Sequence, residues 1–144
     1  MKRLYATLLS ITFAITSVFA QQEDVMVGSL INAGDWFELE RAYPNIKDNV
    51  QTPLLKQVAE VLLAANFNRP DELRSKLPTL IAEHQSEIGF EGVCNMVVMG
   101  ATVEGFNGNY VVAADMIENI VDAVKGVGGS LENSGMEKLL AYYD

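Results

Sequence analysis

The sequence is poor in the side chains that build metal and redox sites. Its 144 residues include one cysteine and one histidine. A single cysteine excludes an intramolecular disulfide and a zinc site built on cysteines, and a single histidine excludes a site with two histidine ligands. The chain also lacks a phosphate-binding glycine loop, an EF-hand calcium loop and a nucleophile elbow. We therefore predict no metal, no cofactor and no catalytic residues.

Positive charge is scarce as well. Ten Lys and Arg residues face 19 Asp and Glu residues, which gives a formal net charge of −9. Such a chain is repelled by the phosphate backbone, so nucleic acid is excluded as a partner. The acidity favours basic or neutral partners. The hydrophobic fraction of 49% is that of a folded globular chain.

Residues 1–20 have the pattern of a secretory signal peptide. Lys2 and Arg3 precede a mostly apolar stretch, and Val18 and Ala20 occupy the positions that a signal peptidase reads. The stretch is shorter than the ~20 residues that span a membrane. We expect cleavage after Ala20, a periplasmic or secreted location, and no stable membrane anchor. Cleavage would leave 8 basic and 19 acidic residues, a net charge of −11.

The remaining chain, residues 21–144, shows helical rather than strand periodicity and predicts one all-α domain of antiparallel helical hairpins. Tyr43-Pro44 is expected to end the second helix, and Pro78 to kink the fourth or split it in two. Residues 126–130 are expected to form a glycine-rich linker before a C-terminal capping helix. About seven helices are predicted, over residues 24–33, 35–42, 53–65, 70–81, 89–106, 109–125 and 131–143.

Apolar stripes on the clearest helices predict the core. Leu62, Val97 and Ile117 are expected to be buried at its centre, each from a different helix. The segment 89–106 is apolar almost all round, which is typical of a central helix.

The turns between these helices suggest a weak repeat. Phe67 and Phe106 are separated by roughly one repeat length of a helical-hairpin array, and Gly34 and Gly108 by roughly two. The segment 108–114, Gly-Asn-Tyr-Val-Val-Ala-Ala, resembles the start of the second helix of a tetratricopeptide repeat (TPR). The spacing here is longer and less regular than the usual TPR period of about 34 residues. The resemblance implies a TPR-like α-solenoid; a small helical bundle with similar turns is the alternative.

A second resemblance rests on three segments. They are residues 30–40 (Leu-Ile-Asn-Ala-Gly-Asp-Trp-Phe-Glu-Leu-Glu), 67–72 (Phe-Asn-Arg-Pro-Asp-Glu) and 84–90 (His-Gln-Ser-Glu-Ile-Gly-Phe). They resemble the N-terminal helical region of secreted bacterial proteins that carry a retropepsin-like aspartyl protease domain. Such proteases need an Asp-Thr-Gly or Asp-Ser-Gly loop, whereas the nearest string here is Asn133-Ser134-Gly135. The resemblance therefore implies an accessory region without the catalytic domain.

Few residues stand out as functional. Cys94 lies in the most apolar segment, where a cysteine acts as a small hydrophobe, and His84 is expected near a helix end. Asp115, Glu118 and Asp122 share one helix face, which we interpret as solvated. The candidate partner-binding residues are the aromatic side chains Trp36, Tyr110, Tyr142 and Tyr143.

Three functions remain open from the sequence. The favoured hypothesis is an exported, non-catalytic helical-repeat module that binds a protein or peptide partner. The alternatives are an accessory region of an aspartyl protease, and a small enzyme with an unrecognised site.

Overall fold

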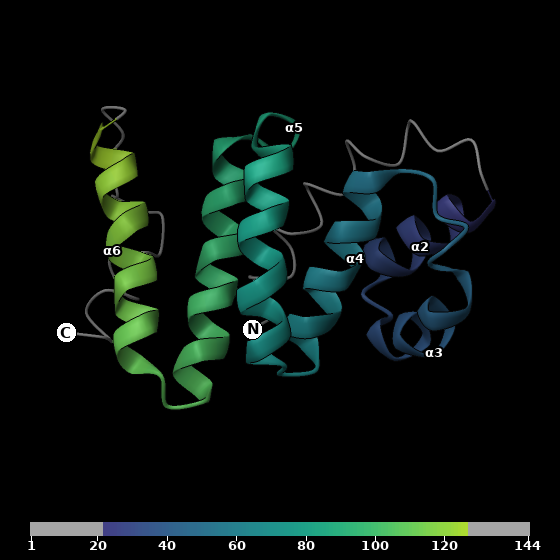
Figure 1. The fold of residues 1–144 in the computed structure, drawn as a ribbon, viewed down its shortest axis with the longest axis horizontal. Helices are drawn as coiled ribbons and strands as arrows, with labels where there is room; N and C mark the ends of the chain where they lie inside the picture. Colours follow the sequence, from purple (N-terminus) through teal and green to yellow (C-terminus); the bar gives the residue numbers. More distant parts are fainter. Residues whose placement is uncertain (1–21, 127–144) are drawn as a thin grey trace.

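A computed structural model describes residues 22–126 of the chain (Figure 1). This part is all-helical and has no strand, which confirms the predicted all-α class. It contains five helices: α2 (Gln22–Ala33), α3 (Trp36–Ile46), α4 (Pro53–Asn66), α5 (Pro70–Phe106) and α6 (Tyr110–Gly126). The predicted number of about seven is too high: six of those helices fall within these residues, and two of the six, 70–81 and 89–106, form the single element α5. The expected signal peptide, the linker after Gly126 and the capping helix lie outside the described residues.

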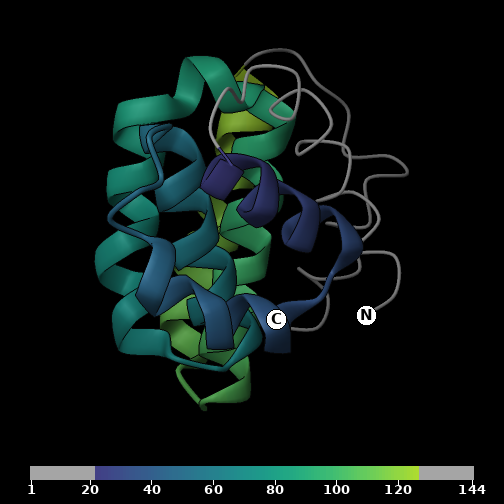
Figure 2. The same ribbon diagram turned by 90° about the vertical axis from the view of Figure 1, so that its right-hand side faces the viewer.

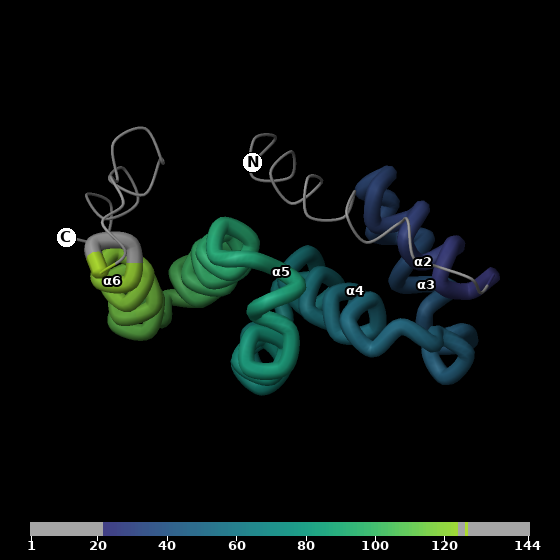
Figure 3. The backbone as a smooth tube through the Cα atoms, turned by 90° about the horizontal axis from the view of Figure 1, so that it is seen from above, coloured from purple at the N-terminus to yellow at the C-terminus, as the bar shows by residue number. Residues whose placement is uncertain are grey.

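Helix α5 folds back on itself at Gly89. That residue has φ 77° and ψ 164°, a conformation that is essentially restricted to glycine. A straight helix would separate Arg74 from Glu104 by about 45 Å, yet their side chains lie 2.6 Å apart. The two segments of α5, before and after Gly89, thus pack side by side (Figures 1 and 3).

The prolines do not end helices as the sequence suggested. Helix α3 continues through Pro44 to Ile46, and α5 continues through Pro78. Both prolines are exposed, so solvent can reach the backbone carbonyls that they leave without an N–H partner. One turn of α5 is further supported by Thr79, whose hydroxyl donates to the carbonyl of Ser75 at 3.2 Å. The kink or split expected at Pro78 does not occur, whereas the reversal at Gly89 lies at the boundary predicted between the segments 70–81 and 89–106.

The helices are arrayed in sequence order along the long axis of the molecule. Viewed from above, α2 and α3 form one end, α4 and the two segments of α5 follow, and α6 forms the other end (Figure 3). Figure 2 looks from the α2–α3 end, with the longer helices running roughly parallel behind. Successive helices are in contact: α2 with α3 and α4, α3 with α4, α4 with α5, and α5 with α6.

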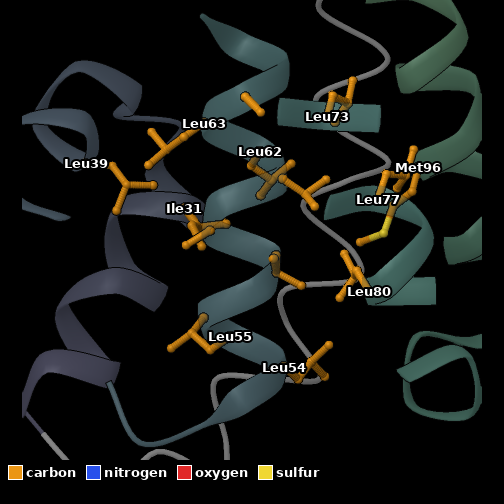
Figure 4. Packing of buried hydrophobic residues seen from close by; sticks show 14 of the residues in the cluster. Ile31, Leu39, Leu54, Leu55, Leu62, Leu63, Leu73, Leu77, Leu80 and Met96 are labelled. Carbon is orange, nitrogen blue, oxygen red and sulfur yellow. The ribbon is translucent and has the colours of Figure 1, made fainter. Parts of the chain in front are cut away.

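Helix α4 is buried on two faces because it lies in the middle of this array. Leu55 and Leu63 point toward α2 and α3, whereas Leu54 points toward α5 (Figure 4). Leu54 and Leu55 are consecutive, so about 100° of helix rotation separates them and they face different neighbours. Full burial of one such leucine is worth about 1.5–3 kcal/mol, so α4 organises the larger hydrophobic cluster of the described chain.

A second hydrophobic cluster joins the later segment of α5 to α6. It includes Cys94, Val98 and Ala101 from α5 and Ala113, Ile117, Ile120 and Val121 from α6. Leu62 and Ile117 are buried as predicted, but Val97 is only partly buried. Its neighbours Met96 and Val98 point into the two clusters instead. The segment is apolar on every side, so its sequence alone does not show which valine faces inward.

A buried carboxylate connects α2 to the start of α4. Asp24 is 1% exposed and accepts hydrogen bonds from the backbone N–H groups of Gln51 and Thr52, at 2.8 and 3.1 Å. The hydroxyl of Thr52 also donates to it, at 2.6 Å. Thr52 is the N-cap residue, as its sequence position suggests, but Asp24 supplies the negative charge at this helix N-terminus.

Candidate interaction surface

Three turns with the same backbone geometry connect the helices. Each contains one residue with positive φ: Gly34 (68°), Asn68 (53°) and Gly108 (78°). In each turn the residue after it donates its N–H back to a carbonyl five residues earlier, as Asp35 does to Leu30 at 3.0 Å. Arg69 and Asn109 repeat this bond to Ala64 and Glu104, at 2.8 and 2.9 Å. This is the Schellman ending, which satisfies the last carbonyls of a helix and fixes the start of the next.

The three turns lie next to one another. The rings of Phe37 and Phe67 meet edge to face with centroids 5.6 Å apart, which joins the first turn to the second. The side-chain amide of Asn107 donates to the Oδ1 of Asn68 at 2.8 Å, which joins the second to the third. We call residues 34–37, 67–70 and 106–111 together the turn edge. The α4–α5 and α5–α6 turns are seen at the lower end of the array in Figure 1.

The turn edge exposes large apolar side chains. Phe37 is 82% exposed, Phe106 74%, Tyr110 62% and Val111 75%. Single exposed apolar residues are common on protein surfaces, but a group on one edge is typical of an interaction site. Aromatic side chains are also favoured at interfaces because they offer a large contact area with few rotatable bonds.

Ion pairs hold the aromatic groups in place. The guanidinium of Arg69 lies over the ring of Phe67, 5.3 Å from its centroid, and pairs with the carboxylate of Glu40 on α3. Arg41 pairs with Glu38 on the same helix. Arg69 on the turn edge and Arg41, one helical turn beyond it on α3, are thus both occupied by carboxylates of the same chain.

A charge cluster around the buried carboxylate of Glu104 supports the third turn, with the half-exposed Arg74 as its cation. Glu104, 2% exposed, accepts hydrogen bonds from the Nε and Nη2 of Arg74 at 2.6 and 2.7 Å. It also accepts one from the amide of Asn109 at 2.8 Å. These hydrogen bonds, those from Arg74 above all, hold the pKa of Glu104 below its ordinary value of 4.5. The cluster fixes both segments of α5 to the start of α6.

The four candidate partner-binding residues have different positions. Tyr110 lies exposed on the turn edge, whereas Trp36 is partly buried and packs against the larger hydrophobic cluster. Tyr142 and Tyr143 lie outside the described residues. Sequence reasoning did not select Phe37, Phe106 and Val111. The available signal was their position: each lies within three residues of a turn glycine.

Cys94 and His84 lie in different surroundings. Cys94 is buried, and burial raises the pKa of its thiol, which disfavours the reactive thiolate. The Nδ1 of His84 lies 2.7 Å from a carboxylate oxygen of Glu87. Within residues 22–126 no cluster of three or more His, Cys, Asp or Glu side chains is placed to hold a metal ion. Nor is any helix of that range long and apolar enough to span a membrane.

Comparisons with protein families, with curated proteins and with solved structures find no match to this chain. The turn edge and the charges around it are the features of the described residues that bear on function.

Proposed function

We propose that this chain is an exported, non-catalytic interaction module with a TPR-like arrangement of helical hairpins. In this proposal it binds a protein or peptide partner through the turn edge. The observation that carries it is the exposure of Phe37, Phe106, Tyr110 and Val111 on adjoining turns of fixed geometry.

The spacing of the turns supports the repeat interpretation. The positive-φ residues Gly34 and Asn68 are separated by the usual period of a TPR, about 34 residues. The step from Asn68 to Gly108 is slightly longer, at about 40 residues. Each turn joins two helices, if the segments of α5 on either side of Gly89 are taken separately. Stacked hairpins of this kind present extended surfaces for peptides and helices.

Site-specific photocrosslinking in the producing cell tests this function. A photoreactive phenylalanine analogue at Phe37 or Phe106 should form a discrete adduct with a partner protein, because both side chains point into solvent. The matched control carries the analogue at Asp48, which is exposed but lies away from the turn edge. Equal adducts from all three positions, or none from the turn edge, would contradict the proposal.

The accessory-region hypothesis stays a prediction. It expects a reading frame with an Asp-Thr-Gly or Asp-Ser-Gly loop next to, or continuous with, that of this chain. No feature of the described helices favours it over a module that acts alone.

A further inference from the structure

Helix α6 presents an exposed face that continues from the turn edge. Its buried residues, Ala113, Ile117, Ile120 and Val121, pack with α5. Val111, Asp115, Glu118 and Asp122 are exposed, and their spacings of four, three and four residues place them on one stripe of the opposite face. Because α6 forms the end of the described array (Figure 3), none of the described helices covers this stripe. We call Asp115, Glu118 and Asp122 the acidic stripe.

Acidic residues outnumber basic residues in this part of the chain, and Lys125, three residues after Asp122, is the Lys or Arg nearest to the acidic stripe in the sequence. The sequence has no Lys or Arg between Lys76 and Lys125, whereas seven carboxylates occur there. Of these, Glu104 is neutralised by Arg74. The other Lys and Arg ion pairs of the described chain involve no residue after Lys76: they are Arg41–Glu38, Arg69–Glu40, Arg74–Asp71 and Lys76–Glu60. The acidic stripe is therefore a region of negative potential directly beside an apolar patch.

The apolar patch begins where the acidic stripe ends. Phe106, Tyr110 and Val111 are all more than half exposed, and Val111 is one helical turn from Asp115. Val111 and Asp122 are separated by about 16 Å at ~1.5 Å per residue. A ligand that matched this face would carry an apolar anchor at one end and positive charges over the following ~16 Å.

Two other occupants of this face fit its charge poorly. A second copy of the chain would bring the same carboxylates against one another, and like charges across an interface are unfavourable. The chain's own residues 127–144 contain three acidic side chains and one lysine, so they would not neutralise the stripe either.

We propose that the outer face of α6 binds a cationic amphipathic peptide segment of a partner protein. The apolar side chains of the peptide contact Phe106, Tyr110 and Val111, and its lysines or arginines pair with the acidic stripe. The inference rests on the proposed interaction function and adds the chemistry of the partner. Charge complementarity of this kind contributes mainly specificity and association rate.

Titration of the protein, expressed from the full 144-residue sequence, with three synthetic peptides tests the proposal. The probe is a short amphipathic peptide of leucine, tryptophan and lysine; in the other two, glutamate or serine replaces lysine. We expect saturable binding of the lysine peptide, with amide NMR shifts concentrated in residues 106–122. The affinity should fall about tenfold or more at ~0.5 M salt, because the ionic contacts are exposed.

Two charge-matched variants separate a specific site from general attraction. Asp115→Asn/Glu118→Gln/Asp122→Asn should weaken binding of the lysine peptide by about tenfold, the sum of three exposed ion pairs. Glu23→Gln/Asp48→Asn/Glu72→Gln removes the same amount of charge elsewhere on the chain. It should change the affinity for the lysine peptide by less than about twofold. Equal losses in the two variants would overturn the proposal.

The peptide series also separates this inference from the proposed function. If the serine or glutamate peptide binds the turn edge as well as the lysine peptide does, the interaction function stands and the inference is wrong. If no peptide binds and photocrosslinking also finds no partner, the proposed function fails with it. Binding that occurs only after deletion of residues 127–144 would assign the face to the chain's own C-terminal segment, which would also overturn the inference.

Discussion

Residues with positive φ determine where the chain reverses. Gly34 and Gly108 allow two of the turns with no side-chain clash, and Asn68 serves in the third because asparagine tolerates the left-handed region better than most residues. Gly89 is the most demanding of them. Its ψ of 164° lies outside the left-handed helical region as well. A side chain there is strained even though no atom within 4 Å would meet its Cβ.

Replacement of Gly89 is therefore expected to destabilise the fold through the backbone alone. Gly89→Ala should lower the free energy of unfolding by about 1–3 kcal/mol, measured by urea denaturation. Gly126→Ala is the control, because Gly126 has an ordinary φ and open space around it. A loss of stability no greater than that of Gly126→Ala would show that α5 reverses without a glycine-specific conformation.

The charge cluster around Glu104 gives a second prediction at the residue scale. The pKa of Glu104 is lower in the folded chain than its ordinary value of 4.5. Its carboxylate therefore stabilises the fold at pH values above 4.5, and that stabilisation is lost as the pH falls through the lowered pKa. Glu104→Gln should lower stability at about pH 7 and reduce the further loss between about pH 7 and about pH 3.

Urea unfolding of the wild type and the variant at several pH values measures this effect. Glu72→Gln is the matched control, because Glu72 is exposed and its carboxylate has no ion pair among the described residues. If Glu104→Gln keeps the full acid dependence of the wild type, then the hydrogen bonds from Arg74 and Asn109 do not favour the charged form.

The helices themselves were largely predictable from the sequence. The boundaries of α4 and α6 follow from Thr52-Pro53 and from the turn at Gly108, where cap and turn residues have direct physical effects. The reversal at Gly89 lies where the sequence places the start of a helix at residue 89, whereas the kink or split expected at Pro78 does not occur. An exposed proline costs less than one whose freed carbonyl is buried. A single sequence shows the proline but not its exposure.

The candidate surface was predictable only in part. Trp36 lies three residues before Leu39 and seven before Tyr43, both buried, and this spacing places it on the core stripe of α3. This spacing can be read from the sequence, and it favours Phe37 rather than its neighbour Trp36 as the exposed aromatic residue. The exposure of Phe106 and Val111 depends on how α5 and α6 meet, which periodicity does not show.

Close packing of the helices makes Gly100 a sensitive position. A Cβ atom there would lie 2.9 Å from Leu77 Cδ2 and 2.7 Å from Met116 Cε, at the junction of both α5 segments with α6. Gly100→Val should destabilise the fold by about 1–3 kcal/mol through overpacking. Gly100→Ala should cost less, since alanine also gains about 1 kcal/mol of helix propensity over glycine.

Thermal unfolding monitored by circular dichroism measures both changes. The double variant Gly100→Val/Met116→Ala should recover part of the loss, because it removes the side chain that comes closest. Additive losses in the double variant would show that the two residues do not compete for the same space.

At the scale of the whole molecule, cleavage of the predicted signal peptide would change the chain that folds. We expect the exported protein to begin at Gln21, because Ala20 is the well-placed small residue after the apolar stretch. Intact-mass spectrometry of protein recovered outside the cytoplasm should show a chain lacking residues 1–20. A mass that includes these residues would contradict both the cleavage site and the net charge of −11.

The uneven charge also predicts how the fold responds to salt. Since no Lys or Arg lies between Lys76 and Lys125, the carboxylates of the acidic stripe, spaced three and four residues apart on one helix face, repel one another with little compensation. Screening of this repulsion should stabilise the chain, so its melting temperature should rise between about 20 mM and about 500 mM NaCl. The variant Asp115→Asn/Glu118→Gln/Asp122→Asn should start from a higher melting temperature at low salt and gain less from added salt. An equal rise of the melting temperature in both proteins would show that salt acts on hydrophobic burial or on other charges. Repulsion within the acidic stripe would then not destabilise the folded chain.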